Sequence, residues 1–210
     1  MPLRSIVVAA LITLLASGIA PIALAKMPTM AGMTQSRGVT QGVGGQNELL
    51  WSKARQTLTA SIHEGWVHGR TVSFRGRTIT LRIVANAPHH HDMSFEAGGL
   101  TNPTISVDQG SQITLTLLNM DYGPGMAHGI VITTKGPPYP PFPDISHTQT
   151  LARIPSLAPR SERRLTQARY AEASVRFRAE TPGTYYYVCP TPGHAEDFRM
   201  YGRFIVRSRR

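Results

Sequence analysis

The chain has little cysteine and few acidic residues. Cys189 is the one cysteine among 210 residues, so no internal disulfide can form, and a disulfide-stabilised scaffold is excluded. Asp and Glu number 12 against 22 Lys and Arg, which leaves a formal net charge of +10. Such a surface favours acidic partners or anionic membrane faces. Nucleic acid is not expected as a partner, because the arginines are scattered through probable strands.

The first 25 residues have the pattern of an export signal. Arg4 supplies the positive charge, residues 6–15 form the apolar segment, and Ala23-Leu24-Ala25 makes a small-residue cleavage site. Residues 6–25 are also about long enough to span a bilayer, so an uncleaved membrane anchor is the alternative. The serine, glycine and proline inside that stretch favour removal. We therefore expect a signal peptide over residues 1–25 and a periplasmic protein.

Two segments of different character follow the signal. Residues 26–46 are rich in Gly, Thr, Gln and Met without a hydrophobic period, which predicts a flexible linker. Residues 47–63 place apolar side chains at near-helical spacing before Gly65, which predicts one amphipathic helix. We expect a single domain over residues 47–210, with this helix as its N-terminal extension.

The rest of the chain has the pattern of short strands separated by Gly and Pro turns. Residues 71–74 and 78–84 alternate on both sides of Arg75-Gly76-Arg77, which predicts a β-hairpin. Further strands are predicted at residues 104–107, 112–118, 129–133, 173–178, 184–189 and 203–207. This pattern favours an all-β sandwich. Proline-rich residues 135–143 cannot join a central ladder and should cross the surface, whereas residues 145–168 have no clear assignment.

Between the last two predicted strands, the cysteine is followed by a histidine and a methionine. Four residues separate Cys189 from His194, and ten separate it from Met200. A thiolate, an imidazole and a thioether on one loop suit a soft, redox-active metal, and a mononuclear blue-copper centre needs one further imidazole. His128, beside the strand predicted at 129–133, can supply it. A buried, inert cysteine is the alternative, but it leaves the ligand spacing unexplained.

These blocks resemble the rusticyanins, which are blue copper proteins of the cupredoxin family. The resemblance is carried by Gly183-Thr-Tyr-Tyr-Tyr-Val-Cys189, Pro192-Gly-His194, Gly202, and His128 before Thr134-Lys-Gly-Pro-Pro-Tyr139, and it spans about residues 47–207. It implies a cupredoxin-like Greek-key β-sandwich that binds one type 1 copper ion. It also implies that Cys189, His128 and His194 are equatorial ligands and that Met200 is the axial ligand.

The chain departs from that family at two positions beside the expected ligands. Five residues separate His194 from Met200 where the family has four, so a backbone carbonyl or a three-coordinate copper is the alternative to Met200. Gly129 follows the first histidine, where the family carries a hydrogen-bonding side chain that helps tie the two ligand loops together. From the sequence, only a backbone amide remains for that role.

Glu196 and Asp197 add two carboxylates to the ligand loop. If they face the metal they stabilise Cu(II), and we expect a reduction potential below that of the rusticyanins. The alternative is that they are solvated, or that they pair with Arg199 and Arg203.

The surroundings of the expected site favour electron transfer. Three tyrosines, residues 185–187, can exclude water from the thiolate while their hydroxyls find partners, and such burial raises the potential. The family resemblance implies that electrons leave through the edge of His194. An apolar collar around this edge is expected from Pro190, Pro192, Phe198 and Met126.

The leading hypothesis is a monomeric periplasmic electron carrier that is not an enzyme and exchanges electrons with c-type cytochromes or other copper proteins. Copper storage or delivery is the alternative, helped by Met27, Met30 and Met33, whose thioethers suit cuprous copper. Multicopper oxidases need a second such domain, and the sequence has no repeat. A hydrolase with a Cys189 nucleophile lacks a third orienting residue. Residues 89–91 are three histidines that could bind a second metal, but adjacent side chains point to opposite faces, so a solvated loop is favoured.

Overall fold

The computed structural model describes residues 45–145 and 149–208. The predicted signal peptide, nearly all of the predicted linker, and Met27, Met30 and Met33 lie outside the described residues. The strands are β1 Asn47–Leu50, β2 Trp66–His68, β3 Thr71–Ser73, β4 Thr78–Ala85, β5 Phe95–Ala97, β6 Leu100–Thr101, β7 Thr104–Asp108, β8 Gln112–Asn119, β9 His128–Thr133, β10 Thr150–Leu157, β11 Arg169–Arg178, β12 Gly183–Val188 and β13 Tyr201–Arg207. The helices are α1 Trp51–His63, η2 Leu165–Gln167 and α2 His194–Asp197.

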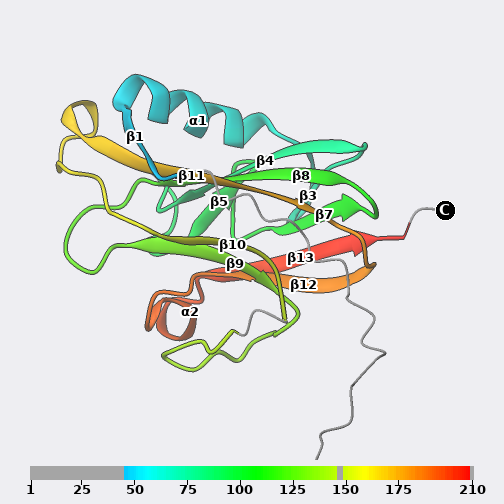
Figure 1. The fold of residues 1–210 in the computed structure, drawn as a ribbon. Helices are drawn as coiled ribbons and strands as arrows, with labels where there is room; N and C mark the ends of the chain where they lie inside the picture. Colours follow the sequence, from blue (N-terminus) through cyan, green and yellow to red (C-terminus); the bar gives the residue numbers. More distant parts are fainter. Residues whose placement is uncertain (1–44, 146–148, 209–210) are drawn as a thin grey trace, which may run out of the picture. The chain divides into compact units, whose positions relative to one another are not determined.

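Two sheets form a β-sandwich, as the sequence predicts (Figure 1). One sheet has the strand order β1-β11-β8-β4-β5-β6, and the other has the order β10-β9-β12-β13-β7-β3-β2. Aromatic contacts join their inner faces, since the rings of Phe177 and Phe204 lie 6.2 Å apart and those of Phe95 and Tyr187 lie 5.7 Å apart. The alternation of buried and exposed residues along β4 and β11 places one side of each strand in this core.

The N-terminal extension is a short strand followed by a helix. Residues Asn47–Leu50 pair antiparallel with β11, so the prediction that the helix starts at residue 47 is wrong for these four residues. The edge of β11 offers unpaired backbone groups, and β1 satisfies them. Helix α1 then lies over the outer face of the six-stranded sheet (Figure 1). It buries Ala54 in a cluster that includes Val84, Leu118, Met120 and Tyr170.

The predicted hairpin of residues 71–74 with 78–84 is wrong. β3 pairs parallel with β7 in the seven-stranded sheet, whereas β4 pairs parallel with β8 in the six-stranded sheet. The turn around Gly76 therefore carries the chain from one sheet to the other. Alternation predicts one buried face for each strand. It does not say whether the two strands pair with each other in a hairpin or lie in opposite sheets of a sandwich.

The remaining predicted strands are confirmed, whereas β1, β2, β5, β6 and β10 were not predicted. Within residues 145–168, β10 pairs antiparallel with β9 at the edge of its sheet, with register shifts. Residues 135–143 join no ladder, as expected, but they do more than cross the surface. Tyr139 is buried beside Val188 and Ala195, and the carbonyl of Pro141 accepts a 2.7 Å hydrogen bond from Gly193. Among the described residues, no helix is long and apolar enough to cross a membrane.

Candidate metal centre

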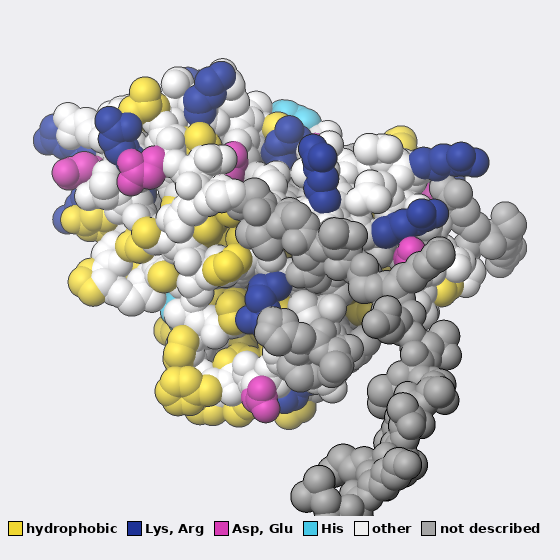
Figure 2. Space-filling view, viewed as in Figure 1, with side chains coloured by type: hydrophobic (Ala, Val, Ile, Leu, Met, Phe, Trp, Pro, Cys, Tyr) yellow, Lys and Arg dark blue, Asp and Glu magenta, His cyan; other side chains and the backbone are white. Residues whose placement is uncertain are grey.

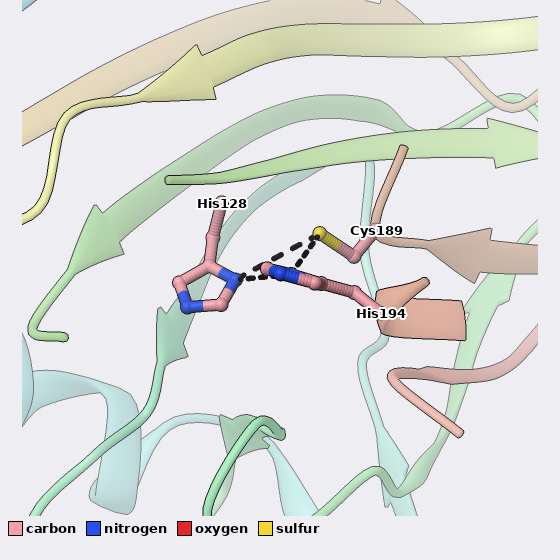
Figure 3. Close-up of side chains that lie close together, drawn as sticks. All are labelled: His128, Cys189 and His194. Atoms are coloured by element: carbon pink, nitrogen blue, oxygen red, sulfur yellow. Dashed lines mark hydrogen bonds between the residues drawn. The ribbon is translucent and has the colours of Figure 1, made fainter. Parts of the chain in front are cut away.

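Three of the predicted ligands converge at one end of the sandwich. His128 begins β9, Cys189 directly follows β12, and His194 begins α2. His128 and Cys189 are fully buried, and His194 is 5% exposed. Their donor atoms point toward one another (Figure 3): Cys189 Sγ lies 3.8 Å from Nδ1 of His128 and 3.5 Å from Nδ1 of His194, and the two Nδ1 atoms are 3.1 Å apart.

The spacing of these atoms fits a single first-row metal ion. Metal bonds of about 2.0 Å to nitrogen and 2.3 Å to sulfur, spread over a near-trigonal plane, put the donor atoms roughly 3–4 Å apart. The three observed separations lie in that range. Two imidazoles and one thiolate are the equatorial donors of a blue-copper site, so the residues fit copper. Among the described residues this is the one group of three or more such donors.

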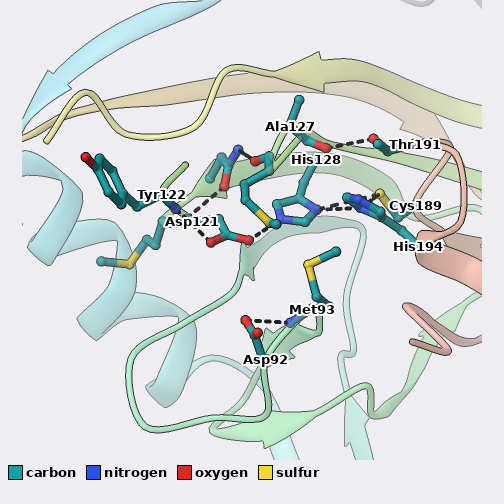
Figure 4. A network of polar contacts seen from close by, with 12 residues as sticks. Asp92, Met93, Asp121, Tyr122, Ala127, His128, Cys189, Thr191 and His194 are labelled. Carbon is teal, nitrogen blue, oxygen red and sulfur yellow. Dashed lines mark hydrogen bonds and ion pairs between the residues drawn. The ribbon is translucent and has the colours of Figure 1, made fainter. Parts of the chain in front are cut away.

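The second nitrogen of His128 is held from behind by a carboxylate. Nε2 of His128 lies 2.8 Å from Oδ2 of Asp121, whose side chain is 7% exposed (Figure 4). Because a carboxylate only accepts, Nε2 carries a proton, and Nδ1 is the nitrogen that is left to bind a metal ion. Burial lowers the pKa of His128, but the contacts with Asp121 and Cys189 outweigh it and raise that pKa to about 9.

The thiol of Cys189 is prepared for deprotonation. Burial alone raises the pKa of Cys189, but the imidazoles of His128 and His194 outweigh burial and lower that pKa to about 6. A thiolate is the form that binds metals, so the histidines stabilise the ligand form before any ion arrives. A coordinated thiolate also explains how an otherwise oxidisable cysteine persists.

Met200 lies at the base of the ligand loop despite the extra residue between it and His194. Its side chain is fully buried in the main core cluster with Cys189. Its amide donates a 3.0 Å hydrogen bond to the carbonyl of His194, and its carbonyl accepts a 3.0 Å bond from the amide of Cys189. The turn of α2, followed by the left-handed backbone of Arg199 (φ 54°), accommodates the longer loop. The insertion therefore leaves the Met200 backbone bonded to both ligand residues.

A side chain ties the two ligand loops together, in contrast to the expectation that only a backbone amide remained. The hydroxyl of Thr191 donates a 2.7 Å hydrogen bond to the carbonyl of Ala127. Gly129 is required for close approach, because a Cβ atom there would lie 2.9 Å from the carbonyl oxygen of Ile154 and 3.0 Å from Pro190. The chain thus replaces a side-chain tie after the first histidine with one from the other loop.

The sequence analysis missed a polar network on the interior side of His128. The side-chain nitrogen Nδ2 of Asn119 lies 3.0–3.1 Å from the carbonyl oxygens of Met126, Leu157 and Ala158. Its Oδ1 accepts a 2.9 Å hydrogen bond from the amide of Asp121. The only sequence signal for this network was two short polar side chains between a buried strand and the expected ligand.

The tyrosines before Cys189 behave largely as predicted. Tyr187 is fully buried and its hydroxyl donates a 2.6 Å hydrogen bond to the carbonyl of Pro103, while Tyr185 is 9% exposed and donates to Thr181. Gly202 leaves the room that the Tyr187 ring occupies, since a Cβ atom there would overlap the ring. These rings pack the strand that ends at the thiolate.

Exposed aromatic rings lie on the surface side of the centre. The ring of Phe198 meets the His194 imidazole edge-on at 6.4 Å and is 52% exposed. Phe142, which is 73% exposed, follows the Pro141 carbonyl that bonds the ligand loop. Figure 2 shows hydrophobic side chains gathered at this end, where α2 and the loop before β10 lie in Figure 1. Phe198 of the predicted collar is confirmed beside His194, and Phe142 was not predicted.

Two sequence hypotheses concern polar side chains near this end. Glu196 and Asp197 are exposed, and the ion pairs between described residues include neither of them. His89 and His91 are exposed, and His90 contacts the Thr101 hydroxyl at 3.0 Å. Within the described residues, the three adjacent histidines belong to no group of donors close enough to share one ion.

Similarity to known proteins identifies the family. A rusticyanin of Acidithiobacillus ferridurans is 30% identical over 180 residues, which cover 84% of this chain and 90% of the relative. A rusticyanin of Acidithiobacillus ferrooxidans is 32% identical over 143 residues, covering 68% and 85%. No family model matches the chain.

Solved structures agree with these relatives. A structure of reduced rusticyanin covers 78% of this chain and all of its own length, with 29% identity and a TM-score of 0.68. A structure of rusticyanin from Thiobacillus ferrooxidans gives the same identity and TM-score. With this sequence similarity, this sandwich and this donor set, the chain belongs to the rusticyanin family of cupredoxins.

Proposed function

We propose that this protein is a periplasmic type 1 copper protein that carries single electrons between redox partners. The observation that carries the proposal is the buried triad of His128, Cys189 and His194, whose donor atoms all lie within 4.8 Å of one another. We propose Met200 as the axial ligand, because its backbone is bonded to both Cys189 and His194. Copper bound at this position supplies a one-electron couple between Cu(II) and Cu(I).

The side chains around the centre suit rapid electron exchange because they are already held in place. Asp121 fixes the ring of His128, the Met200 carbonyl fixes the amide of Cys189, and Thr191 joins the two loops. Such contacts leave the donors little freedom to move when the charge of the centre changes. A small reorganisation energy is therefore expected.

The edge of His194 is the proposed site of electron entry and exit. His194 lies beside the exposed ring of Phe198, at the end of the molecule where hydrophobic side chains gather (Figure 2). A small apolar patch allows brief contact with a partner such as a c-type cytochrome or another copper protein. The basic surface of a monomer would also favour an anionic membrane face.

We infer an electron carrier rather than an enzyme because the donors are closed off. None of the three is more than 5% exposed. Metal sites that act on substrates keep an open coordination position that a substrate can reach. Export to the periplasm is inferred from the signal pattern of residues 1–25.

The test is a Cu(II) titration of the purified protein, followed by visible and electron paramagnetic resonance spectra through a cycle of reduction and reoxidation. We expect an intense thiolate-to-copper band that saturates at one ion and bleaches reversibly. Cys189→Ala should abolish the band, and Met200→Leu should keep it while changing the spectrum. The matched control is Met93→Leu, because Met93 is a buried methionine outside the proposed ligand set.

The same titration separates electron transfer from copper delivery. A delivery protein would prefer Cu(I) and pass it to a metal-free acceptor, and it would show no stable blue form. Colourless binding, or simple oxidation of Cys189 by Cu(II), would contradict the proposed function.

A further inference from the structure

A buried carboxylate lies directly behind one of the proposed copper ligands. Oδ2 of Asp121 is 2.8 Å from Nε2 of His128, and Asp121 as a whole is 5% exposed. The imidazole ring lies between this carboxylate and the metal position (Figure 4). Solvent screens a charge in such a place far less than a charge on the surface.

The hydrogen bonds around Asp121 favour its charged form. Oδ1 accepts a 2.7 Å bond from the amide of Tyr122, and Oδ2 faces Nε2 of His128. When Nδ1 of His128 binds a metal, its Nε2 carries the proton, so both carboxylate oxygens face N–H donors. A carboxamide would turn its NH₂ group toward one of these N–H groups, and a protonated acid would need a further acceptor for its O–H. An ionised carboxylate accepts from both N–H groups and needs no further partner.

The chain holds this carboxylate in place from several directions. The amide of Asp121 donates to Asn119, and its carbonyl accepts a 2.8 Å bond from the amide of Arg160. The Arg160 guanidinium donates to the carbonyl of Met120 and lies 5.4 Å from the centre of the Tyr122 ring. Met120 itself is fully buried in the cluster beneath α1. The N-terminal extension and the loop before η2 thus support the residue behind His128.

We propose that Asp121 is a positioning residue that also lowers the reduction potential: it orients His128 with Nδ1 toward the metal, and its negative charge favours the oxidised ion. The charge acts through the imidazole, which becomes a stronger electron donor when its Nε2–H is bonded to a carboxylate. The attraction is greater for a divalent than for a monovalent ion, so the effect on the two oxidation states differs. This inference rests on the proposed function.

The test compares Asp121→Asn with Asp92→Asn. Asp92 is a matched control because it is exposed and its Oδ1 also accepts the amide of the next residue, Met93, at 3.1 Å. We expect Asp121→Asn to lower the ratio of the Cu(II) to the Cu(I) binding constant by about tenfold, which raises the potential by about 59 mV for one electron. Asp92→Asn should change that ratio by less than about twofold, since solvent screens its charge.

A second variant keeps the test valid if Asp121→Asn folds poorly. The carboxamide introduced by Asp121→Asn would turn its NH₂ group toward an N–H donor, whereas Asp121→Ala removes the charge without adding a donor, and the ratio should fall in the same direction. In the parent protein loaded with Cu(I), nitrogen-15 spectra should show a slowly exchanging Nε2 proton on His128. Asp121→Ala should speed its exchange.

The outcomes separate this inference from the proposed function. A blue band that is retained in either variant, with a binding ratio within twofold of the parent, would overturn the role of Asp121 alone. A rapidly exchanging Nε2 proton in the parent would do the same for its orienting role. If the parent itself develops no blue band, the proposed function fails, and the role of Asp121 fails with it.

Discussion

The two ligand histidines occupy opposite kinds of surroundings. His128 is fully buried, begins a central strand and is bonded through Nε2 to a carboxylate inside a polar network. His194 begins a short helical turn and lies against the half-exposed ring of Phe198. The interior side holds a buried carboxylate and a buried amide in fixed positions, whereas the surface side has an exposed aromatic ring and two exposed carboxylates. Under the proposed function, this difference separates two tasks: the interior side sets the properties of the centre, and the surface side lets electrons pass.

Breaking the interior side at Asn119 should have the largest effect. Asn119→Ala leaves three carbonyl oxygens and the amide of Asp121 without their partner in a fully buried position. We expect the free energy of unfolding to fall by about 2–4 kcal/mol, since each lost buried hydrogen bond has a desolvation cost. Denaturant unfolding of the metal-free protein measures this.

The control for Asn119 is Gln112→Ala. Gln112 is exposed and donates one 3.1 Å hydrogen bond, to the carbonyl of Phe177, so its removal should cost under about 1 kcal/mol. Equal losses in the two variants would mean that the interior network contributes no more than an ordinary surface contact.

A bulkier residue at Gly129 would disturb the contacts of β9 with β10 and with the ligand loop. In Gly129→Ala the new methyl group would press on the carbonyl oxygen of Ile154 and on Pro190, at the separations that any Cβ there would have. We expect a loss of about 1–3 kcal/mol from overpacking, together with a weaker blue band as His128 shifts. Gly45→Ala is the control, because a Cβ at Gly45 meets no atom within 4 Å. A fully stable G129A protein would show that β10 can move aside.

Loss of the tie between the ligand loops should have a smaller effect. Thr191→Val keeps the shape of the side chain but removes the 2.7 Å hydrogen bond to the carbonyl of Ala127. We expect a loss of about 1 kcal/mol in unfolding free energy. Thr191→Ser keeps the hydroxyl and should lose less. If valine and serine behave alike, the hydroxyl does not hold the loops together.

The four proposed ligands were predictable from the sequence, and the polar network behind His128 was not. Cys189, His194 and Met200 are close in the chain, so their spacing already indicates one loop and one metal. His128 adds the missing imidazole in a strand-like segment. By contrast, Asp121 is seven residues before His128, and its approach to Nε2 depends on the fold of the intervening loop. No spacing rule brings these two side chains together.

The errors in the fold have the same origin. Alternation predicted strands at residues 71–74 and 78–84 but could not tell which sheet each would join. Residues 47–50 have an apolar spacing that suits a helix, yet they form a strand because they pair with the open edge of β11. Thr191 was passed over because a hydroxyl in a loop has no preferred partner until the other loop is placed beside it. Contacts between distant segments decide each of these cases.

The carboxylates of the ligand loop test whether exposed charge affects the copper less than buried charge does. Their removal has the smallest expected effect on the reduction potential. Glu196 and Asp197 are closer to His194 in sequence than Asp121 is to His128, but both are exposed. Exposed charges are screened by water and salt, over about 8 Å at physiological ionic strength. The double variant Glu196→Gln, Asp197→Asn should therefore raise the potential by less than Asp121→Asn does.

We expect the ratio of Cu(II) to Cu(I) binding constants in this double variant to fall by less than about threefold, and the change to shrink as salt is added. Exchange with a charged redox partner should respond more, because these residues lie in the turn that begins with His194. Voltammetry at two ionic strengths measures the first effect, and stopped-flow mixing measures the second. A salt-independent shift as large as that of Asp121→Asn would mean that charge at the surface side tunes the copper as strongly as buried charge. An unchanged potential would overturn the expectation that this acidic pair lowers it.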